Sequence, residues 1–221
     1  MAKLIAIEGI DGAGKGTQAK LLVERLREVG HTAELIGFPR YQETLFGQAV
    51  AKFLNGGFGP LDQVDPFLAA SLYAGDRFES LPVVKAATEV NDYIIFDRYY
   101  GSNLAHQGAR VPEDERAEFI ERVKQLEFEV YGIPKPDLTI LLDLPADLAR
   151  KQVEKKAKRD YTELTVDLQE ENLEYQIKVR ECYRELAEIE DSWVAIACND
   201  TLSEVRPIHE IAGEIQHQRI G

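Results

Sequence analysis

Short apolar runs alternate along the chain with longer segments in which apolar residues recur at helical spacing. The short runs occupy 4–7, 32–38, 93–96, 138–143 and 194–198, and each has the length of a buried parallel strand. Between the first two runs, apolar residues repeat at helical spacing over 19–29, and Gly30 follows where a helix cap belongs. This alternation of strands and helices predicts an α/β fold with a parallel sheet.

The other helices are placed by the same periodicity and by residues that start or stop helices. They are expected within 44–58, over 66–77, over 101–108 as a helix or loop, over 113–131, from Pro145, over 168–190 and over 203–217. The segment 55–60 is expected to be an irregular loop. The apolar stripe within 113–131 suits either the core or a dimer contact.

Length and composition limit the kinds of protein that this sequence can encode. The 221 residues suit one large domain, 1–221, with a sizeable core. The net charge of −13 disfavours polymeric DNA or RNA as a partner, because nucleic-acid binding requires a surplus of lysine and arginine. Cys182 and Cys198 lack the spacing of a disulfide framework or a zinc site. Since no signal peptide or membrane-spanning run fits, a soluble cytoplasmic protein is expected.

Residues 3–17 combine a buried strand, a glycine-rich turn and the start of a helix. Gly9, Gly12 and Gly14 let the backbone turn its N–H groups inward around an anion, since glycine accepts positive φ and has no Cβ. The helix N-terminus adds partial positive charge, and Lys15 can reach the outer phosphates of a nucleoside triphosphate. A chance glycine-rich turn is disfavoured, because a strand and an amphipathic helix flank the Gly-x4-Gly-Lys motif.

One position departs from the usual phosphate-binding motif. The lysine is normally followed by Ser or Thr, which helps to hold magnesium, whereas here Gly16 follows and Thr17 comes one residue later. We therefore expect magnesium to be held more through water and through another carboxylate.

Charged and aromatic residues follow two other predicted strands. Arg40 and Tyr41 come after the strand that Pro39 ends, which places them to bind a second anionic substrate; a solvated loop is the alternative. Asp97 follows the strand 93–96 and can bind magnesium through water, while Arg98 can bridge two phosphate groups. A structural ion pair between these two residues is the alternative.

Three further features concern base recognition, metal binding and closure of the site. Tyr73 and Arg77 share one helix face and could bind a base, or could form a stack on the surface. His106 has no carboxylate or cysteine at ligand spacing, so metal binding is not expected there. The basic cluster between Lys151 and Arg159 could be a lid, at about 150–166, or a solvated helix face.

The chain closely resembles the thymidylate kinases over nearly its whole length. The resemblance rests on four motifs in order: the glycine-rich phosphate-binding loop at residues 9–17 (the P-loop), Phe38-Pro39-Arg40-Tyr41, Tyr73-x3-Arg77 and Asp97-Arg98-Tyr99-x3-Asn103. The resemblance implies a three-layer P-loop NTPase fold, with a five-stranded parallel sheet flanked by helices and a short lid. It also implies transfer of the γ-phosphoryl group of ATP to thymidine monophosphate (dTMP) with Mg²⁺, and a homodimer.

The same resemblance implies roles for individual residues. Lys15 would stabilise the transferred group, Arg98 would contact both phosphates, Asp97 would support magnesium, and Asp11 would approach the sugar 3′-hydroxyl. The expected ATP-binding residues are Gly9, Ile10, Asp11, Gly12, Ala13, Gly14, Lys15, Gly16, Thr17 and Arg159. The expected substrate-binding residues are Phe38, Arg40, Tyr41, Tyr73, Arg77, Arg98, Asn103, His106 and Gln107. Among these, Tyr73 would stack on thymine, and Arg77 and Asn103 would bind its polar edge.

Three alternative functions compete with this interpretation. A kinase of another nucleoside monophosphate or of a nucleoside is mildly favoured by Gly16 and by His106, which stands where many thymidylate kinases have an aromatic ring. The Tyr73-x3-Arg77 and Asp97-Arg98-Tyr99 motifs argue against it. The acidic charge disfavours a regulatory or DNA-processing ATPase. A GTPase is disfavoured because the chain has no Asn-Lys-x-Asp tetrapeptide.

Overall fold

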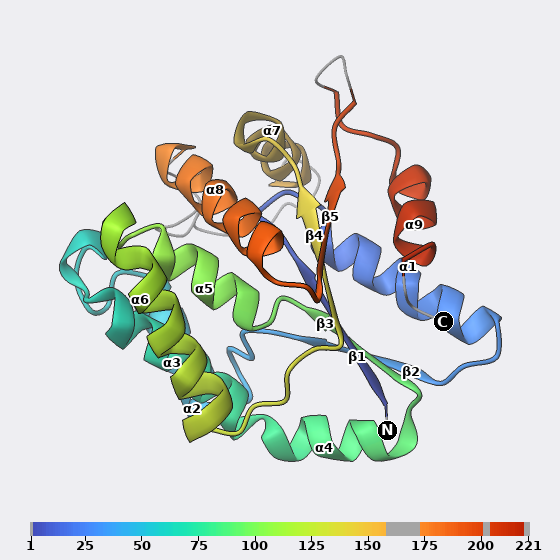
Figure 1. Ribbon diagram of the computed structural model, residues 1–221, viewed down its shortest axis with the longest axis horizontal. Helices are drawn as coiled ribbons and strands as arrows, with labels where there is room; N and C mark the ends of the chain where they lie inside the picture. Colours follow the sequence, from blue (N-terminus) through green and yellow to red (C-terminus); the bar gives the residue numbers. More distant parts are fainter. Residues whose placement is uncertain (1, 158–172, 201–203, 219–221) are drawn as a thin grey trace.

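A computed structural model describes residues 2–157, 173–200 and 204–218, and within them five parallel strands form one sheet (Figure 1). The sheet order is β2-β3-β1-β4-β5. The strands are β1 (Lys3–Glu8), β2 (Ala33–Gly37), β3 (Tyr93–Asp97), β4 (Leu138–Asp143) and β5 (Trp193–Ala197). All five predicted strands are confirmed, and each strand end lies at the predicted residue or one residue from it.

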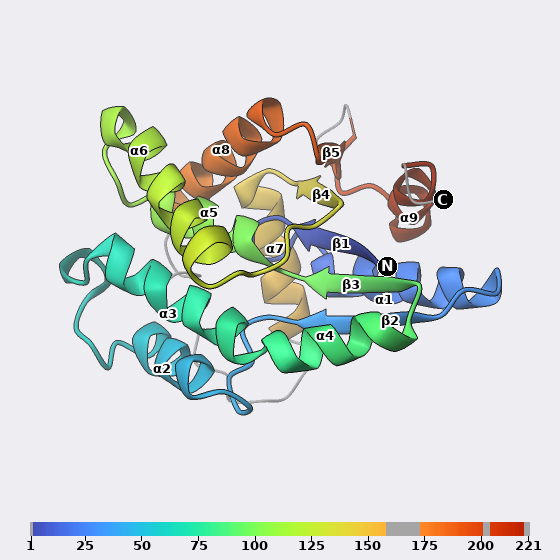
Figure 2. The same ribbon diagram turned by 60° about the horizontal axis from the view of Figure 1, so that its bottom comes forward.

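Helices lie on both faces of this sheet, so the protein has three layers. They are α1 (Lys15–Glu28), α2 (Leu45–Leu54), α3 (Pro66–Glu79), α4 (Leu81–Val90), α5 (Tyr100–Gly108), α6 (Glu113–Lys124), α7 (Ala146–Ala157), α8 (Leu173–Ile189) and α9 (Ile208–Gln216). Helices α1 and α9 cover one face, while α4, α5 and α8 cover the other (Figures 1 and 2). The predicted α/β fold with a five-stranded parallel sheet is therefore confirmed.

The strands form a sheet that is buried on both faces, because apolar side chains dominate both sides of its centre. In β1, Ile5 and Ile7 point to the same face, Ala6 points to the other, and all three are fully buried. The register pairs Ile5 with Ile95 on one side and with Leu138 on the other. Such continuous burial fixes the sheet rigidly, and the loops that follow its strands are placed at one common edge.

Local sequence explains where several helices begin. The Thr44 hydroxyl accepts the N–H of Gly47 at the start of α2, and the Asp65 carboxylate accepts the N–H groups of Phe67 and Leu68 at the start of α3. Pro66 occupies the first turn of α3, where its missing N–H costs nothing.

Helix α4 is not among the predicted elements. Only Val84 and Ala87 are buried on it, and a stripe of two small apolar side chains gives a weak periodic signal. Its start is equally hard to predict, because Ser80 both ends α3 and precedes α4. The predicted helix 113–131 is also modified, since α6 passes into a π-helical segment at Gln125–Val130.

None of the helices in the described ranges is both long enough and apolar enough to cross a membrane. Of the predicted lid, the structure describes residues 150–157, which belong to α7, and Lys151 on this helix is exposed and 4.0 Å from the Asp147 carboxylate. Lys158, Arg159 and the rest of the predicted lid lie outside the described residues.

Candidate active site

The glycine-rich loop lies between β1 and α1, as the sequence predicts. Gly12 has φ +86°, and a Cβ at that position would lie 2.2 Å from the carbonyl oxygen of Ala149. Gly14 has φ +92° and precedes α1 without providing a side-chain cap. The first N–H groups of α1 therefore have no side-chain cap and are available to bind an anion.

Lys15 is buried at the bottom of this loop. Its Nζ donates to the Ile10 carbonyl oxygen at 2.8 Å and lies 3.8 Å from Asp11 Oδ1. Burial, together with the positive charge of Arg98, lowers the pKa of Lys15 to about 8, although Asp11 opposes this shift. A phosphate group at the loop would compensate the Lys15 charge better than these partners do.

Arg98 and Asp11 form an ion pair between the end of β3 and the P-loop. Arg98 has φ +64°, an uncommon backbone conformation for a residue with a side chain, and its Nη1 donates to the Ser102 hydroxyl at 3.1 Å. Burial alone would raise the pKa of Asp11, but Arg98 and Lys15 outweigh it and hold this pKa well below its usual range. Burial would lower the pKa of Arg98, but Asp11 and Glu8 help to raise it. Both groups are therefore charged at neutral pH.

A pocket at the carboxyl ends of the strands contains most of the residues predicted to bind substrate. These residues are Asp11, Phe38, Tyr41, Tyr73, Arg77, Arg98, Asn103, His106 and Gln107. They come from the P-loop, the loop after β2, helix α3, the turn after β3 and helix α5. Residues far apart in the sequence thus converge on one cavity, as expected at this edge of a parallel sheet.

Arg40 lies in a second hollow next to this pocket, and Phe38 and Arg98 line both. The Arg40 backbone N–H donates to Asp76 at 2.9 Å, and its guanidinium donates to the Ser80 hydroxyl at 3.3 Å. The second hollow also contains Asp97. Arg40 and Arg98 therefore both line the second hollow, which suits an anionic group placed between them.

Asp97 lies directly beside the P-loop. A Cβ at Gly16 would lie 2.9 Å from Asp97 Oδ2, so the missing side chain at this position leaves room for the carboxylate. Within the residues that the structure describes, no three His, Cys, Asp or Glu side chains form a group that could hold a metal by themselves. A single carboxylate beside a phosphate-binding loop fits a magnesium ion bound mainly by nucleotide phosphates and water.

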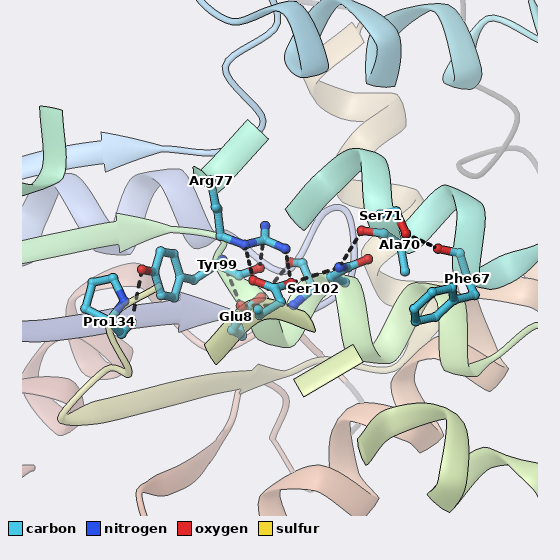
Figure 3. A network of polar contacts seen from close by, with 10 residues as sticks. Glu8, Phe67, Ala70, Ser71, Arg77, Tyr99, Ser102 and Pro134 are labelled. Carbon is cyan, nitrogen blue, oxygen red and sulfur yellow. Dashed lines mark hydrogen bonds and ion pairs between the residues drawn. The ribbon is translucent and has the colours of Figure 1, made fainter. Parts of the chain in front are cut away.

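Arg77 binds a buried carboxylate, that of Glu127, which was not predicted from the sequence to be part of the site. Glu127 accepts hydrogen bonds from Arg77 Nε at 2.7 Å, from Arg77 Nη2, and from Asn103 Nδ2 at 2.9 Å. Figure 3 shows Arg77 within this polar network. Arg77 and Glu127 are 3% and 0% exposed, so a surface stack of Tyr73 on Arg77 is excluded. Tyr73 instead meets Phe53 edge to face, at 6.4 Å between ring centroids.

Three buried polar atoms at the pocket have no hydrogen-bond partner in the described part of the chain. They are Asn103 Oδ1, His106 Nε2 and Gln107 Nε2. The Asn103 amide is oriented by its donor group, which binds the Ala70 carbonyl at 3.0 Å as well as Glu127. Buried polar atoms are costly when left unpaired, so these three atoms are available to bind water or a polar ligand in the pocket.

The chemical character of the other two atoms follows from their neighbours. Gln107 Oε1 accepts from Arg110 Nη1 at 2.6 Å, which leaves the Gln107 amide nitrogen as a donor facing the pocket. The Tyr175 hydroxyl donates its single proton to the backbone carbonyl oxygen of His106 at 2.8 Å. That proton is therefore not available to His106 Nδ1. Burial and the nearby Arg98 lower the pKa of His106 to about 3, so its ring is neutral at neutral pH.

The whole chain is similar to known proteins of one family. The family model described as thymidylate kinase matches residues 7–210. A thymidylate kinase from Mycobacterium tuberculosis (strain ATCC 25618 / H37Rv) is 35% identical over 184 residues, covering 83% of this chain and 85% of the relative. A probable thymidylate kinase from Thermococcus onnurineus is 34% identical over 220 residues, covering 97% of each chain. The structure of a thymidylate kinase from Candida albicans is similar in fold, with a TM-score of 0.68, 23% identity, and coverage of 97% of this chain and 89% of that one.

Proposed function

Because the chain belongs to the thymidylate kinase family, we propose that it transfers the γ-phosphoryl group of ATP to the phosphate of dTMP. The bond between the γ-phosphorus and the β,γ-bridging oxygen of ATP breaks, and a bond forms to a phosphate oxygen of dTMP. The products are ADP and thymidine diphosphate. The observation that carries this proposal is the side-chain carbonyl oxygen of Asn103, which is buried, has no hydrogen-bond partner among the described residues and lies in the pocket that Arg77 also lines.

Thymine is favoured by the order of donors and acceptors at this end of the pocket. Its N3–H would donate to Asn103 Oδ1, and its O4 would accept from Arg77, whose Nη1 makes only a long contact of 3.4 Å with the Tyr99 carbonyl among the described residues. Cytosine presents an acceptor at N3 and a donor at N4, so both positions would be mismatched. A site built from buried hydrogen-bonding groups discriminates strongly against such a mismatch. Tyr73 would stack on the base.

The sugar and phosphate of dTMP would lie nearer to the P-loop. The Asp11 carboxylate would accept a hydrogen bond from the 3′-hydroxyl. His106 and Gln107, which belong to helix α5, line the pocket as well. Phe38, Arg40 and Tyr41 would surround the acceptor phosphate. Arg98 would contact this phosphate and the migrating group, where negative charge spreads in the transition state.

ATP would bind at the P-loop. Backbone N–H groups of residues 12–17 would surround its phosphates, and Lys15 would stabilise the transferred group. Mg²⁺ would be held by the ATP phosphates and by Asp97 through water, and it supplies positive charge to the phosphates. The contribution of Arg159 stays a prediction, because that residue lies outside the described ranges.

A homodimer is a further proposal from the family. Phe119, Ile120 and Val123 of α6 are buried within the single chain, so the apolar stripe of this helix is part of the core. Exposed apolar side chains nearby, such as Val130 and Leu68, are the remaining candidates for a contact between subunits. Sedimentation or light scattering of the purified protein measures its oligomeric state directly.

The test of the proposed function is an acceptor panel. Purified protein with ATP and magnesium should form ADP fastest with dTMP, and much more slowly with adenosine, cytidine or uridine monophosphate. An equal or greater rate with one of the other monophosphates would contradict the assignment.

A further inference from the structure

Glu8 is a fully buried acidic residue that the proposed reaction does not use. It is the last residue of β1, directly before the P-loop, and its side chain is 0% exposed. Its Oε1 accepts the backbone N–H groups of Tyr99 and Ser102 at 2.8 and 3.0 Å. Its Oε2 accepts the hydroxyl groups of Ser102 and Tyr183 at 2.6 and 3.1 Å. Figure 3 shows Glu8 beside Tyr99 and Ser102, at the point where β1 meets the start of α5.

The two carboxylate oxygens of Glu8 accept hydrogen bonds from different groups and so have different roles. Oε1 satisfies N–H groups at the beginning of α5, which is an ordinary structural role for an acid at a helix N-terminus. Oε2 takes the proton of the Ser102 hydroxyl, which leaves the lone pairs of Ser102 Oγ to accept from other donors. One such donor is Arg98 Nη1, at 3.1 Å. Glu8 therefore determines which way the Ser102 hydroxyl points, and that orientation suits Arg98.

Among the described residues, the Arg98 guanidinium makes two polar contacts of different kinds. One is the ion pair with Asp11, whose carboxylate lines the substrate pocket and would be shared with the sugar of dTMP. The other is Ser102, which is backed by the buried Glu8 that no substrate can touch. The Ser102 contact does not involve Asp11, so it would remain available to Arg98 if dTMP bound the Asp11 carboxylate. The negative charge of Glu8 also contributes to raising the pKa of Arg98.

We propose that Glu8 is a positioning residue that acts through the Ser102 hydroxyl to hold the Arg98 guanidinium in place for phosphoryl transfer. This role rests on the proposed function, in which Arg98 contacts both the acceptor phosphate and the migrating group. Tyr183, from α8, supports the same arrangement, because its hydroxyl lies 2.8 Å from Ser102 Oγ and 3.1 Å from Glu8.

Two substitutions separate this role from the structural one. Glu8→Gln keeps an oxygen for the backbone N–H groups but replaces Oε2 with an amide that donates to Ser102 Oγ and competes with Arg98. Ser102→Ala removes the hydroxyl altogether, while Ser102→Thr keeps it. Ser71→Ala is the matched control, because the Ser71 hydroxyl donates only within α3, to the Phe67 carbonyl at 2.8 Å among the contacts of the described residues (Figure 3).

The expected result is a loss in kcat with little change in KM. Glu8→Gln and Ser102→Ala should each lower kcat for dTMP by about 10-fold or more, since small displacements of a positioned group are costly. Ser102→Thr should recover most of the rate, and Ser71→Ala should match the wild type. If Glu8→Gln does not fold, the serine variants alone decide the question.

A double-mutant cycle with Arg98→Ala gives the decisive comparison. If Ser102 acts through Arg98, Ser102→Ala should have little further effect on kcat in the Arg98→Ala background. Additive losses, or an unchanged kcat in Ser102→Ala, would overturn the positioning role while leaving the proposed function intact. A wild-type protein that forms no ADP with dTMP would overturn both.

Discussion

The buried pair of Arg77 and Glu127 allows a quantitative prediction about stability. Glu127→Gln preserves the shape of the side chain but removes its charge, which leaves the Arg77 guanidinium, at 3% exposure, without the counter-charge that it binds directly. Breaking a buried ion pair by removing one partner costs about 3–5 kcal/mol. For a chain of this size, each kcal/mol lowers Tm by roughly 2–4 °C, so the variant should melt about 6–20 °C below the wild type.

The matched control is Glu121→Gln on the adjoining helix α6. Glu121 also pairs with a cation, Lys124 at 2.9 Å, but it is 72% exposed. Exposed pairs contribute about 0–1 kcal/mol, so this variant should melt close to the wild type. Thermal unfolding followed by circular dichroism, at one pH and one protein concentration, compares the three proteins.

Two outcomes bear on the reasoning. A Tm for Glu127→Gln no lower than that of Glu121→Gln would refute the importance of the buried pair. Replacing both partners by apolar residues, as Arg77→Met with Glu127→Leu, should recover much of the stability, because such replacements are often neutral. The double variant should nevertheless bind dTMP poorly, since Arg77 and the Glu127 contact to Asn103 are both lost.

Three further predictions concern the P-loop and the cysteines. Gly12→Ala should destabilise the protein more than Gly14→Ala in urea unfolding, because both residues have positive φ but only a Cβ at Gly12 meets backbone, 2.2 Å from the Ala149 oxygen; equal losses would contradict this. Burial and Arg98 lower the pKa of Lys15 to about 8, so Lys15 loses its charge above that pH when no ATP is bound. The affinity for ATP, measured by calorimetry, should therefore weaken from pH 7 to pH 9. A flat profile would count against it. Burial raises the pKa of Cys182 to about 11 and that of Cys198 to about 12, so a thiol reagent at pH 8 should modify them only after unfolding.

The strands and the position of the site could be predicted because both depend on local sequence. Each buried parallel strand is a short apolar run, and the residue after such a run must lie at the carboxyl edge of the sheet. Arg98 and Asp11 could therefore be expected to lie near each other. Their roles in catalysis remain proposals.

The supporting residues could not be predicted in this way, because their partners are distant in the sequence. Arg77 and Glu127 are separated by 50 positions, and Glu8 and Tyr183 by 175. One sequence shows that Glu8 and Glu127 are acidic, but burial and pairing only become apparent once the chain is folded. A signal was present nonetheless, since both acids interrupt apolar segments, where an unpaired carboxylate would be costly.

Discrimination between dTMP and deoxycytidine monophosphate (dCMP) tests the central claim most directly, because the two bases differ in the donors and acceptors that face Asn103 and Arg77. The measurement is the ratio of kcat/KM for dTMP to that for dCMP, in the wild type and in Asn103→Ala. We predict a wild-type ratio of at least about 10², in line with sites that bind a substrate by buried hydrogen bonds, and a clear fall in Asn103→Ala. Equal kcat/KM for the two nucleotides in the wild type would contradict the account.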